Sequence, residues 1–423
     1  MRALKSAGFV VAAQVSKILV GLVLIKLAAI YVGVEGFGQL GHLMSLVTMM
    51  TLLAGGGIVN GLIKYTSEYR NNIRDVLEFA SASATYSLFV SGALFIVLVV
   101  FAKDIAGFVF STPGFEWVIR LLAASQLCIA FSNLVTGIAN GYKNTKVFAT
   151  VQIVGNVLSI LVIWWLISSF AYMGAAVSIA ISYAFMAVPA FFFFYKSRFW
   201  GRIRLGLYFK EPHFKRLFGF TLMLVVSATT FPFTEMYIRE MIINGSGFSD
   251  AGLWQALIKL SSVYIGFFGL FLSYYFIPTV SPMQSGTEIS KTTFKYLVVA
   301  SGLFLVGALA LVLASGIILP LLLSDDFLVL EDFLIYQLVG DVFKISAFVI
   351  GFVFVAKAAV KVYIVAELFQ NALFIMLASL FYTESHNLGS IMDAYIVTYV
   401  VYFVVSLIVF FIFLKKRWLA SGM

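Results

Sequence analysis

The chain has 423 residues, of which 62% are hydrophobic and 11% are charged, and its mean hydropathy is +1.04. Soluble domains carry about 25% charged residues, so this composition excludes a soluble globular protein and predicts a polytopic membrane protein. A single cysteine, Cys128, excludes a disulfide within the chain. The net charge of +9 does not indicate a nucleic-acid partner, because the basic residues gather between apolar segments.

The apolar segments predict an all-α fold with twelve transmembrane helices, since about 20 residues span a ~30 Å hydrocarbon layer. The twelve spans lie near 7–31, 39–62, 79–101, 117–140, 147–168, 172–195, 216–243, 251–277, 294–316, 331–356, 361–382 and 393–414. The first follows MRALKSAG and lacks a small-residue cleavage site, so we expect it to be a retained span rather than a signal peptide.

The placement of basic residues predicts that both termini lie in the cytoplasm. With the N-terminus inside, the inner segments contain 21 of the 28 Lys and Arg residues. The outer loops contain one, Lys103, and the loop at 325–332 is acidic. This asymmetry satisfies the positive-inside rule.

A basic linker at 196–215 divides the spans into six and six. We therefore predict an N-lobe at 1–195 and a C-lobe at 216–414, followed by a cytoplasmic tail at 415–423, with the two six-helix lobes around a central cavity. The linker itself is expected to contact anionic lipid headgroups.

The sequence gives no indication of an enzyme. No P-loop or nucleophile elbow is present, and no outer loop has room for a catalytic domain. The three histidines lack metal-ligand spacing, so neither a metal nor a cofactor is predicted: they are His42, His213 and His386.

The first span contains two lysines, Lys17 near its middle and Lys26 in its second half. An ammonium group at the bilayer centre costs about 2.5 kcal/mol or more, so such residues usually face a bundle interior or a wet cavity. Lys26 also has the alternative of snorkelling to the outer interface. Nine residues separate the two, about half a helical rotation, so on a straight helix they cannot share one face.

Further charges lie in the spans or at their edges. The cations are Lys17, Lys26, Arg120, Arg239, Lys259 and Lys344, and the acids are Glu235, Asp341 and Glu367. Glu235 and Arg239 share one helix face, as do Asp341 and Lys344, so each pair is either a local ion pair or a functional one.

Depth and neighbours separate these candidates. Asp341 and Lys344 are predicted near the middle of the membrane, and Lys259 toward its outer side. Glu367 is predicted toward the inner side, as an inner-gate group or a packing residue.

The glycine cluster at 55–61 permits close helix contact or bending, with packing the default role.

Five stretches resemble one family in chain order. They are LLAGGGIVNGLIKY (52–65), GLWQALIKL (252–260), YQLVGDVFKISAFVIGFVFVAKA (336–358), YIVAELFQ (363–370) and AYIVTYVVYF (394–403). These stretches are similar to enterobacterial Wzx flippases, of the polysaccharide-transporter branch of the superfamily that contains the multidrug MATE exporters. The likeness covers nearly the whole chain.

This resemblance implies alternating access in a bacterial inner membrane. The substrate would be an undecaprenyl-diphosphate-linked oligosaccharide, either an O-antigen unit or lipid III, moved from the cytoplasmic to the periplasmic leaflet. Membrane lipids, a glycan polymerase and a chain-length regulator are the further expected partners. Lys17, Lys26, Asp341 and Lys344 stand at matching positions of the family, whereas Lys259 does not clearly match.

A cationic cavity is the predicted chemistry, because a diphosphate of charge about −2 is attracted more strongly at low dielectric. The expected substrate-binding residues are Lys17, Lys26, Lys259, Lys344 and Arg239, and the expected proton-coupling or gating residues are Asp341, Glu235 and Glu367. Coupling is open between the membrane potential and proton antiport. A cation- or proton-coupled drug antiporter of the same superfamily is the alternative function.

Overall fold

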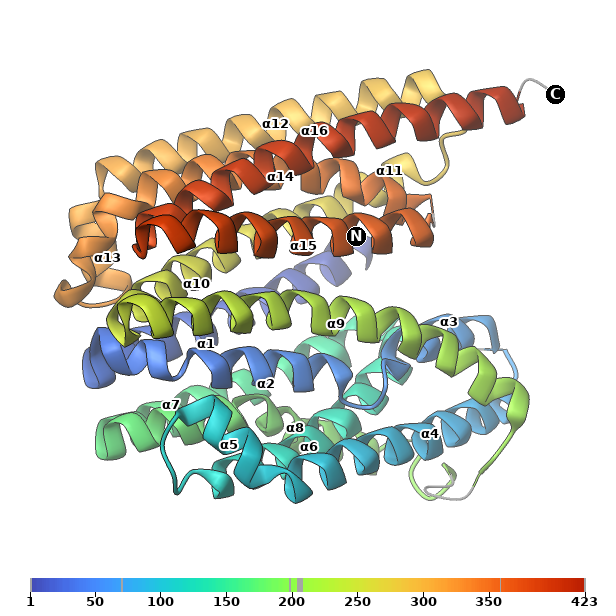
Figure 1. Cartoon of the computed structure of the whole chain (residues 1–423). Coiled ribbons are helices and arrows are strands. Elements are labelled where there is room, and N and C mark those ends of the chain that lie inside the picture. The colour runs from blue at the N-terminus through green and yellow to red at the C-terminus, as the bar shows by residue number, and fades with distance from the viewer. Residues whose placement is uncertain (1, 70, 198, 204–207, 358, 422–423) are drawn as a thin grey trace. The chain divides into compact units, whose positions relative to one another are not determined.

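The computed structural model describes residues 2–69, 71–197, 199–203, 208–357 and 359–421. Every regular element in these ranges is a helix (Figure 1). The chain divides into two compact units, one of residues 1–33 and 39–232 and one of residues 34–38 and 233–423. The predicted lobe boundary at the basic linker, 196–215, stays a prediction.

The first unit consists of helices from the first half of the chain. They are α1 (Arg2–Gln39), α2 (Gly41–Leu53), α3 (Ile58–Tyr69), α4 (Ile73–Val100), α5 (Ala102–Phe110), α6 (Glu116–Gly141), α7 (Thr145–Ile181), the 3₁₀ turn Ser182–Met186, α8 (Ala187–Tyr195) and the first part of α9 (Glu211–Ser246). Helix α1 has non-helical backbone at Gly33, and its last residues belong mainly to the second unit.

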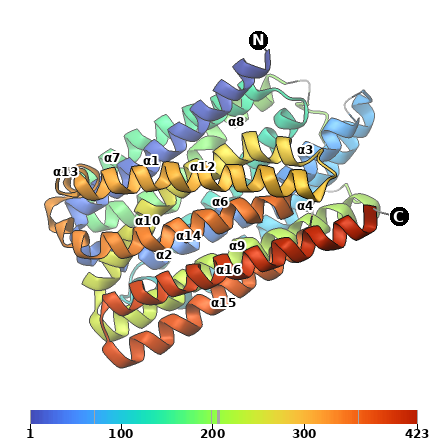
Figure 2. The ribbon, with the colours of Figure 1, turned by 90° about the horizontal axis from the view of Figure 1, so that it is seen from above.

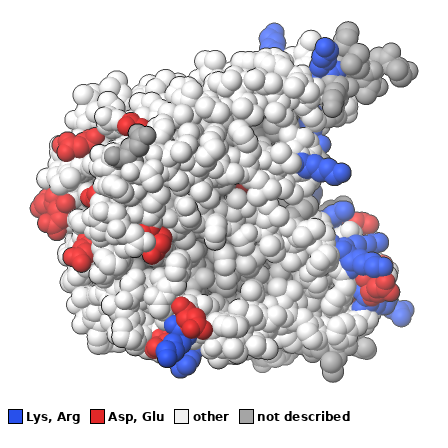
Figure 3. Space-filling model, in the orientation of Figure 1, with Lys and Arg blue, Asp and Glu red and all other residues white. Residues whose placement is uncertain are grey.

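The second unit contains the rest of α9 and the helices that follow it. They are α10 (Phe248–Phe271), a π-helical turn at Leu272–Phe276, α11 (Ile277–Val280), α12 (Gly286–Leu313), α13 (Ser315–Leu322), the 3₁₀ turn Asp325–Leu330, α14 (Glu331–Ala356), α15 (Val360–Ser385) and α16 (Leu388–Ser421). Helix α14 packs against α16 and α12 within this unit (Figure 2). Acidic side chains gather at the end where α14 begins, and basic ones at the other end (Figure 3).

Eleven segments of the described residues are long and apolar enough to cross a membrane. The longest, Thr145–Tyr195, covers two predicted spans, 147–168 and 172–195. Its backbone is non-helical at Ala171, with φ 45° and ψ −117°, between those two spans. The twelve predicted crossings therefore map onto these segments in order, and the all-helical membrane fold is confirmed.

The second span is interrupted rather than continuous. Gly55, Gly56 and Gly57 all have positive φ values, 79°, 66° and 69°, which side chains other than glycine rarely adopt. Asn133 donates to the Ala54 carbonyl at 3.1 Å, and similar bonds from neighbouring helices fix the adjoining backbone. The glycine cluster thus ends α2 and starts α3, in addition to the packing role that the sequence favours.

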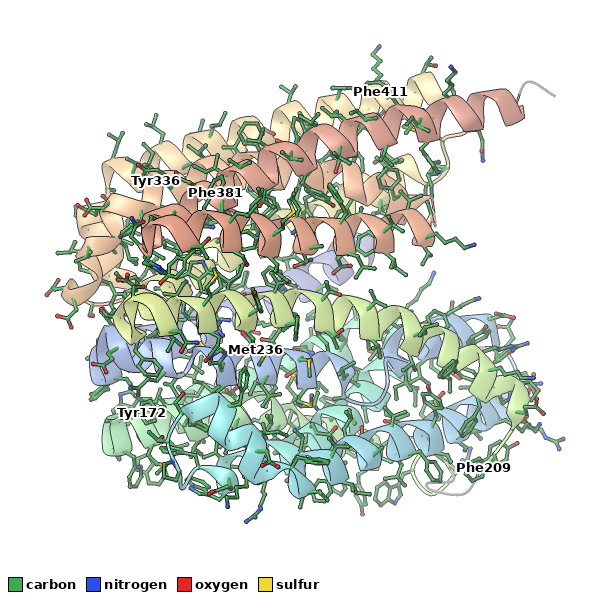
Figure 4. All side chains as sticks on the ribbon, in the orientation of Figure 1. Tyr172, Phe209, Met236, Tyr336, Phe381 and Phe411 are labelled. Carbon is green, nitrogen blue, oxygen red and sulfur yellow. The ribbon has the colours of Figure 1, made fainter. Side chains whose placement is uncertain are left out.

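Polar and aromatic contacts hold the start of α9 against α4 in the first unit. Lys210 and Glu78 form an ion pair, which raises the pKa of Lys210 above its ordinary value. Phe209, labelled in Figure 4, packs against Phe89 and Phe214 with ring centres 5.2 and 5.3 Å away. These contacts fasten the start of α9 to α4.

Close helix contact in the second unit depends on Gly252. A Cβ atom there would lie 2.9 Å from the Val34 carbonyl carbon and 3.1 Å from the Gly38 nitrogen. We expect Gly252→Ala to lower the free energy of unfolding by about 1–3 kcal/mol, because backbone atoms cannot yield to the added methyl group. Thermal unfolding in detergent measures this loss. Gly266→Ala, on the same helix with no heavy atom within 4 Å, is the control and should unfold like the parent.

Candidate functional site

Asp341 lies near the middle of α14 and is completely buried. Its Oδ2 atom accepts hydrogen bonds from Ser261 Oγ at 2.9 Å, from Gln337 Nε2 at 3.1 Å and from the Tyr264 hydroxyl. Its Oδ1 atom accepts one from the Tyr395 hydroxyl at 2.6 Å. Four donors from α10, α14 and α16 therefore converge on one carboxyl group, which as a carboxylate can accept from all of them.

Lys344 follows Asp341 by one helical turn, and Tyr395 touches both. The Lys344 Nζ atom donates to the Tyr395 hydroxyl at 3.1 Å and lies 4.9 Å from the centre of the Tyr399 ring. The Tyr395 hydroxyl therefore accepts from the ammonium and donates to the carboxylate. This links the charges of Asp341 and Lys344 through one phenol.

The close approach of α16 to α14 places Tyr395 between these two charges. The Tyr395 ring packs directly on Gly340, where an added Cβ atom would overlap the ring carbons. Tyr399, one turn further along α16, also accepts from Gln370 Nε2 on α15 at 2.9 Å. The aromatic side chains of α16 thus connect the charged face of α14 to α15.

The charged pair of α9 lies in the same unit. Arg239 is completely buried, with its guanidinium donating to Gln255 and lying 5.6 Å from the Trp254 ring. Glu235 is also buried, at 5% exposure. Lys259 is half-buried on α10 of the same unit, and its predicted grouping with Glu235 and Lys344 stays a prediction.

Glu367 is half-buried on α15. Its backbone carbonyl accepts from Asn371 Nδ2 at 2.9 Å. It lies one turn from Gln370, which bonds Tyr399. The two predicted roles, gating and packing, therefore stay open.

Lys17 and Lys26 belong to the first unit. Lys17 is exposed on α1, with its Nζ atom 6.0 Å from the centre of the Tyr183 ring. Lys26 is half-buried and takes part in a hydrogen bond, an ion pair or another electrostatic contact. Next to Lys17, Asn156 of α7 donates to Ser16 Oγ at 2.8 Å. The predicted gathering of both lysines with Lys344 in one cavity stays a prediction.

Four donors to Asp341 are absent from the predicted site: Ser261, Tyr264, Gln337 and Tyr395. The sequence offered a weak signal for two of them, because Ser261 and Tyr264 are three residues apart and so share a face of α10. Tyr395 lies within the stretch AYIVTYVVYF, one of those that carry the family resemblance.

Comparisons with known proteins agree with this architecture. The chain is 29% identical over 416 residues to the lipid III flippase of Escherichia coli (strain K12), covering 97% of this chain and 99% of that protein. The lipid III flippase of Shigella flexneri matches to the same extent.

Solved structures show the same fold. An inward-facing multidrug MATE transporter of the MOP superfamily matches with a TM-score of 0.75 and 16% identity, over 94% of this chain and 96% of that one. An outward-facing multidrug MATE transporter of this superfamily matches with a TM-score of 0.61 and 13% identity, over 96% of each chain. The expected MATE-like fold is confirmed.

A family sequence pattern completes the comparison. Residues 3–284 match the family described as "Polysaccharide biosynthesis protein". These residues include most of the chain and reach from α1 to the end of α11. The chain belongs to the polysaccharide biosynthesis protein family.

Proposed function

We propose that this protein is a flippase. It moves an undecaprenyl-diphosphate-linked oligosaccharide, an O-antigen unit or lipid III, from the cytoplasmic to the periplasmic leaflet of the bacterial inner membrane. The observation that carries the proposal is the 29% identity to lipid III flippases over 97% of the chain. Membership of the polysaccharide biosynthesis protein family supports the same substrate class.

The cations of the spans bind the substrate headgroup in this proposal. A diphosphate has a charge of about −2, and its attraction to an ammonium group grows as the dielectric constant falls. Lys17, Lys26 and Lys344 hold the diphosphate and the sugar head, and Lys259 and Arg239 are further substrate-binding residues. The prenyl tail stays in the lipid, so only the polar head needs a hydrated passage.

Asp341 is the coupling group that the geometry supports best. A protonated carboxyl must donate one hydrogen, so it cannot accept from all four donors at once. Tyr395 is the donor that also holds Lys344. Protonation of Asp341 removes the charge that strengthens its hydrogen bond from Tyr395, which loosens the contact of Tyr395 with Lys344 and changes the hold of Lys344 on the diphosphate. Glu235 and Glu367 are the remaining candidates for coupling or gating.

The membrane potential is a second source of energy. An inside-negative potential favours outward movement of an anion by about 2.3 kcal/mol per charge per 100 mV.

Both termini lie in the cytoplasm in this proposal, which the basic inner segments support. The cavity between the six-helix lobes 1–195 and 216–414 opens alternately to the two sides of the membrane in this proposal. A glycan polymerase and a chain-length regulator then act on the transported product.

A small-molecule antiporter is the second candidate function, favoured by the MATE fold alone. One experiment separates the two. Deletion of the gene should cause unflipped lipid-linked oligosaccharide to accumulate in the cytoplasmic leaflet, and the cloned chain should reverse the accumulation. Drug sensitivity without accumulation would favour the antiporter.

A further inference from the structure

A cavity of about 600 Å³ opens in the first unit, and its lining includes none of the predicted charges of the spans. It lies where α6 ends, α7 begins and α8 passes into the linker. The lining residues are Val135, Ile138, Ala139, Tyr142, Lys143, Asn144, Val147, Phe193, Phe194, Ser197 and Phe199. The volume falls within the range of about 300–1,000 Å³ that is typical of sites for small ligands.

The inner wall of this cavity is apolar. Ile138, Phe194 and Phe199 are each less than one-tenth exposed, and the rings of Tyr142 and Phe199 lie 5.8 Å apart. Ser197 fixes the turn that brings Phe199 back over the cavity, because its Oγ donates to the Phe194 carbonyl at 2.7 Å and accepts from the Phe199 amide at 3.2 Å. Such a wall suits hydrocarbon rather than a soluble anion.

One lysine belongs to the lining of the cavity, and two others precede lining residues in the chain. Lys143 is exposed in a turn with φ 58°, which is closed by the Lys143 amide bonding the Asn140 carbonyl at 2.8 Å. Lys146 and Lys196 are also exposed, and the Lys196 Nζ atom lies 4.2 Å from the centre of the Phe192 ring. Within the described ranges, no ion pair involves these three lysines.

Aromatic side chains mark the depth of the cavity in the membrane. Trp200 is 45% exposed, and its ring lies 5.0 Å from that of Tyr195 and 5.6 Å from that of Phe194. Tyrosine and tryptophan gather where a membrane meets water. The aromatic side chains therefore favour an opening at the level of the lipid headgroups.

We infer that this cavity binds an anionic membrane phospholipid. Part of one acyl chain lies against Ile138, Phe194 and Phe199, and the phosphate lies by Lys143 and Lys196. Basic pockets between transmembrane helices on the cytoplasmic side bind anionic headgroups in this way. The inference uses neither Lys344 nor Asp341, so it does not depend on the proposed flipping site.

Native mass spectrometry of the purified full-length protein tests the inference, with phosphatidylglycerol and phosphatidylcholine of the same acyl chains as probes. Phosphatidylglycerol should bind more tightly. Lys143→Gln with Lys196→Gln should weaken its binding roughly twenty-five-fold, since each lysine contributes about a factor of five. The matched control is Lys291→Gln with Lys361→Gln, two exposed lysines of the second unit, which should leave binding unchanged.

A second variant tests the inference independently, because it fills the cavity and changes no charge. Ala139 is buried in the lining, so Ala139→Phe should displace phosphatidylglycerol although every lysine remains. Equal binding of both lipids, or full binding to the lysine variant, would overturn the inference. Competition with undecaprenyl phosphate gives a further outcome that would overturn the inference. If this lipid displaces phosphatidylglycerol from the parent protein but not from the lysine variant, the occupant of the cavity is the carrier lipid.

Discussion

Replacing Lys17, Lys26 and Lys344 together with alanine is expected to impair flipping severely without preventing membrane insertion. Truncating one partner of a close charge pair at a desolvated interface costs about 2–5 kcal/mol, so losing three cations should slow transport at least about a hundredfold. Insertion should improve, because a lysine at the bilayer centre opposes it. Transport of lipid-linked oligosaccharide into sealed vesicles measures the loss, and immunoblotting measures the protein in the membrane.

The control removes the same charge elsewhere. Lys291, Lys361 and Lys415 are exposed in predicted cytoplasmic segments, and their triple alanine variant should transport nearly as well as the parent. Transport at the parental rate by the Lys17, Lys26 and Lys344 variant would refute the role of these lysines in headgroup binding. A variant with arginine at all three positions should keep the charge and retain part of the activity.

Asp341→Asn should slow flipping at least about tenfold and remove its response to the proton gradient. The asparagine amide has one oxygen acceptor, so it cannot accept from all the donors that surround Asp341, and each buried polar group left without a partner costs about 1–3 kcal/mol. The measurement is the transport rate before and after the pH gradient is collapsed at constant membrane potential. A variant that still responds to the gradient would exclude Asp341 as the coupling group.

Two tyrosine variants separate coupling from simple support of the carboxylate. Tyr395 and Tyr264 both donate to Asp341, but Tyr395 also accepts from Lys344. Tyr395→Phe should therefore reduce transport more than Tyr264→Phe, although each removes one hydroxyl from the same carboxyl group. Equal losses in the two variants would show that Tyr395 only supports Asp341.

The charged part of the site was predictable because a charge in an apolar span stands out. Asp341 and Lys344 are visible in the sequence of α14 for this reason. Their connection through Tyr395 was not predictable, since tyrosine is common in a chain with 17% aromatic residues. Tyr395 also lies 54 residues beyond Asp341, so its contact depends on the packing of α16 on Gly340.

The fold, like the site, was predictable from the sequence only in part. Hydropathy predicted the order of the helices, since each must cover its backbone polar groups within the lipid. The interruption between α2 and α3 was not predicted as such, because three glycines are compatible with close packing as well as with positive φ values. What decides between them is the set of bonds from other helices, including that from Asn133 to Ala54.

The donors around Asp341 also bear on the biogenesis of the protein. Translation produces α14 before α16, so the nascent α14 enters the membrane without Tyr395. A carboxylate at the centre of a lone helix costs about 2.5–3.5 kcal/mol on insertion scales. Asp341 therefore has its full set of donors only after the last helix has been made, and a truncated product that ends before α16 is expected to be less stable in the membrane than the full chain.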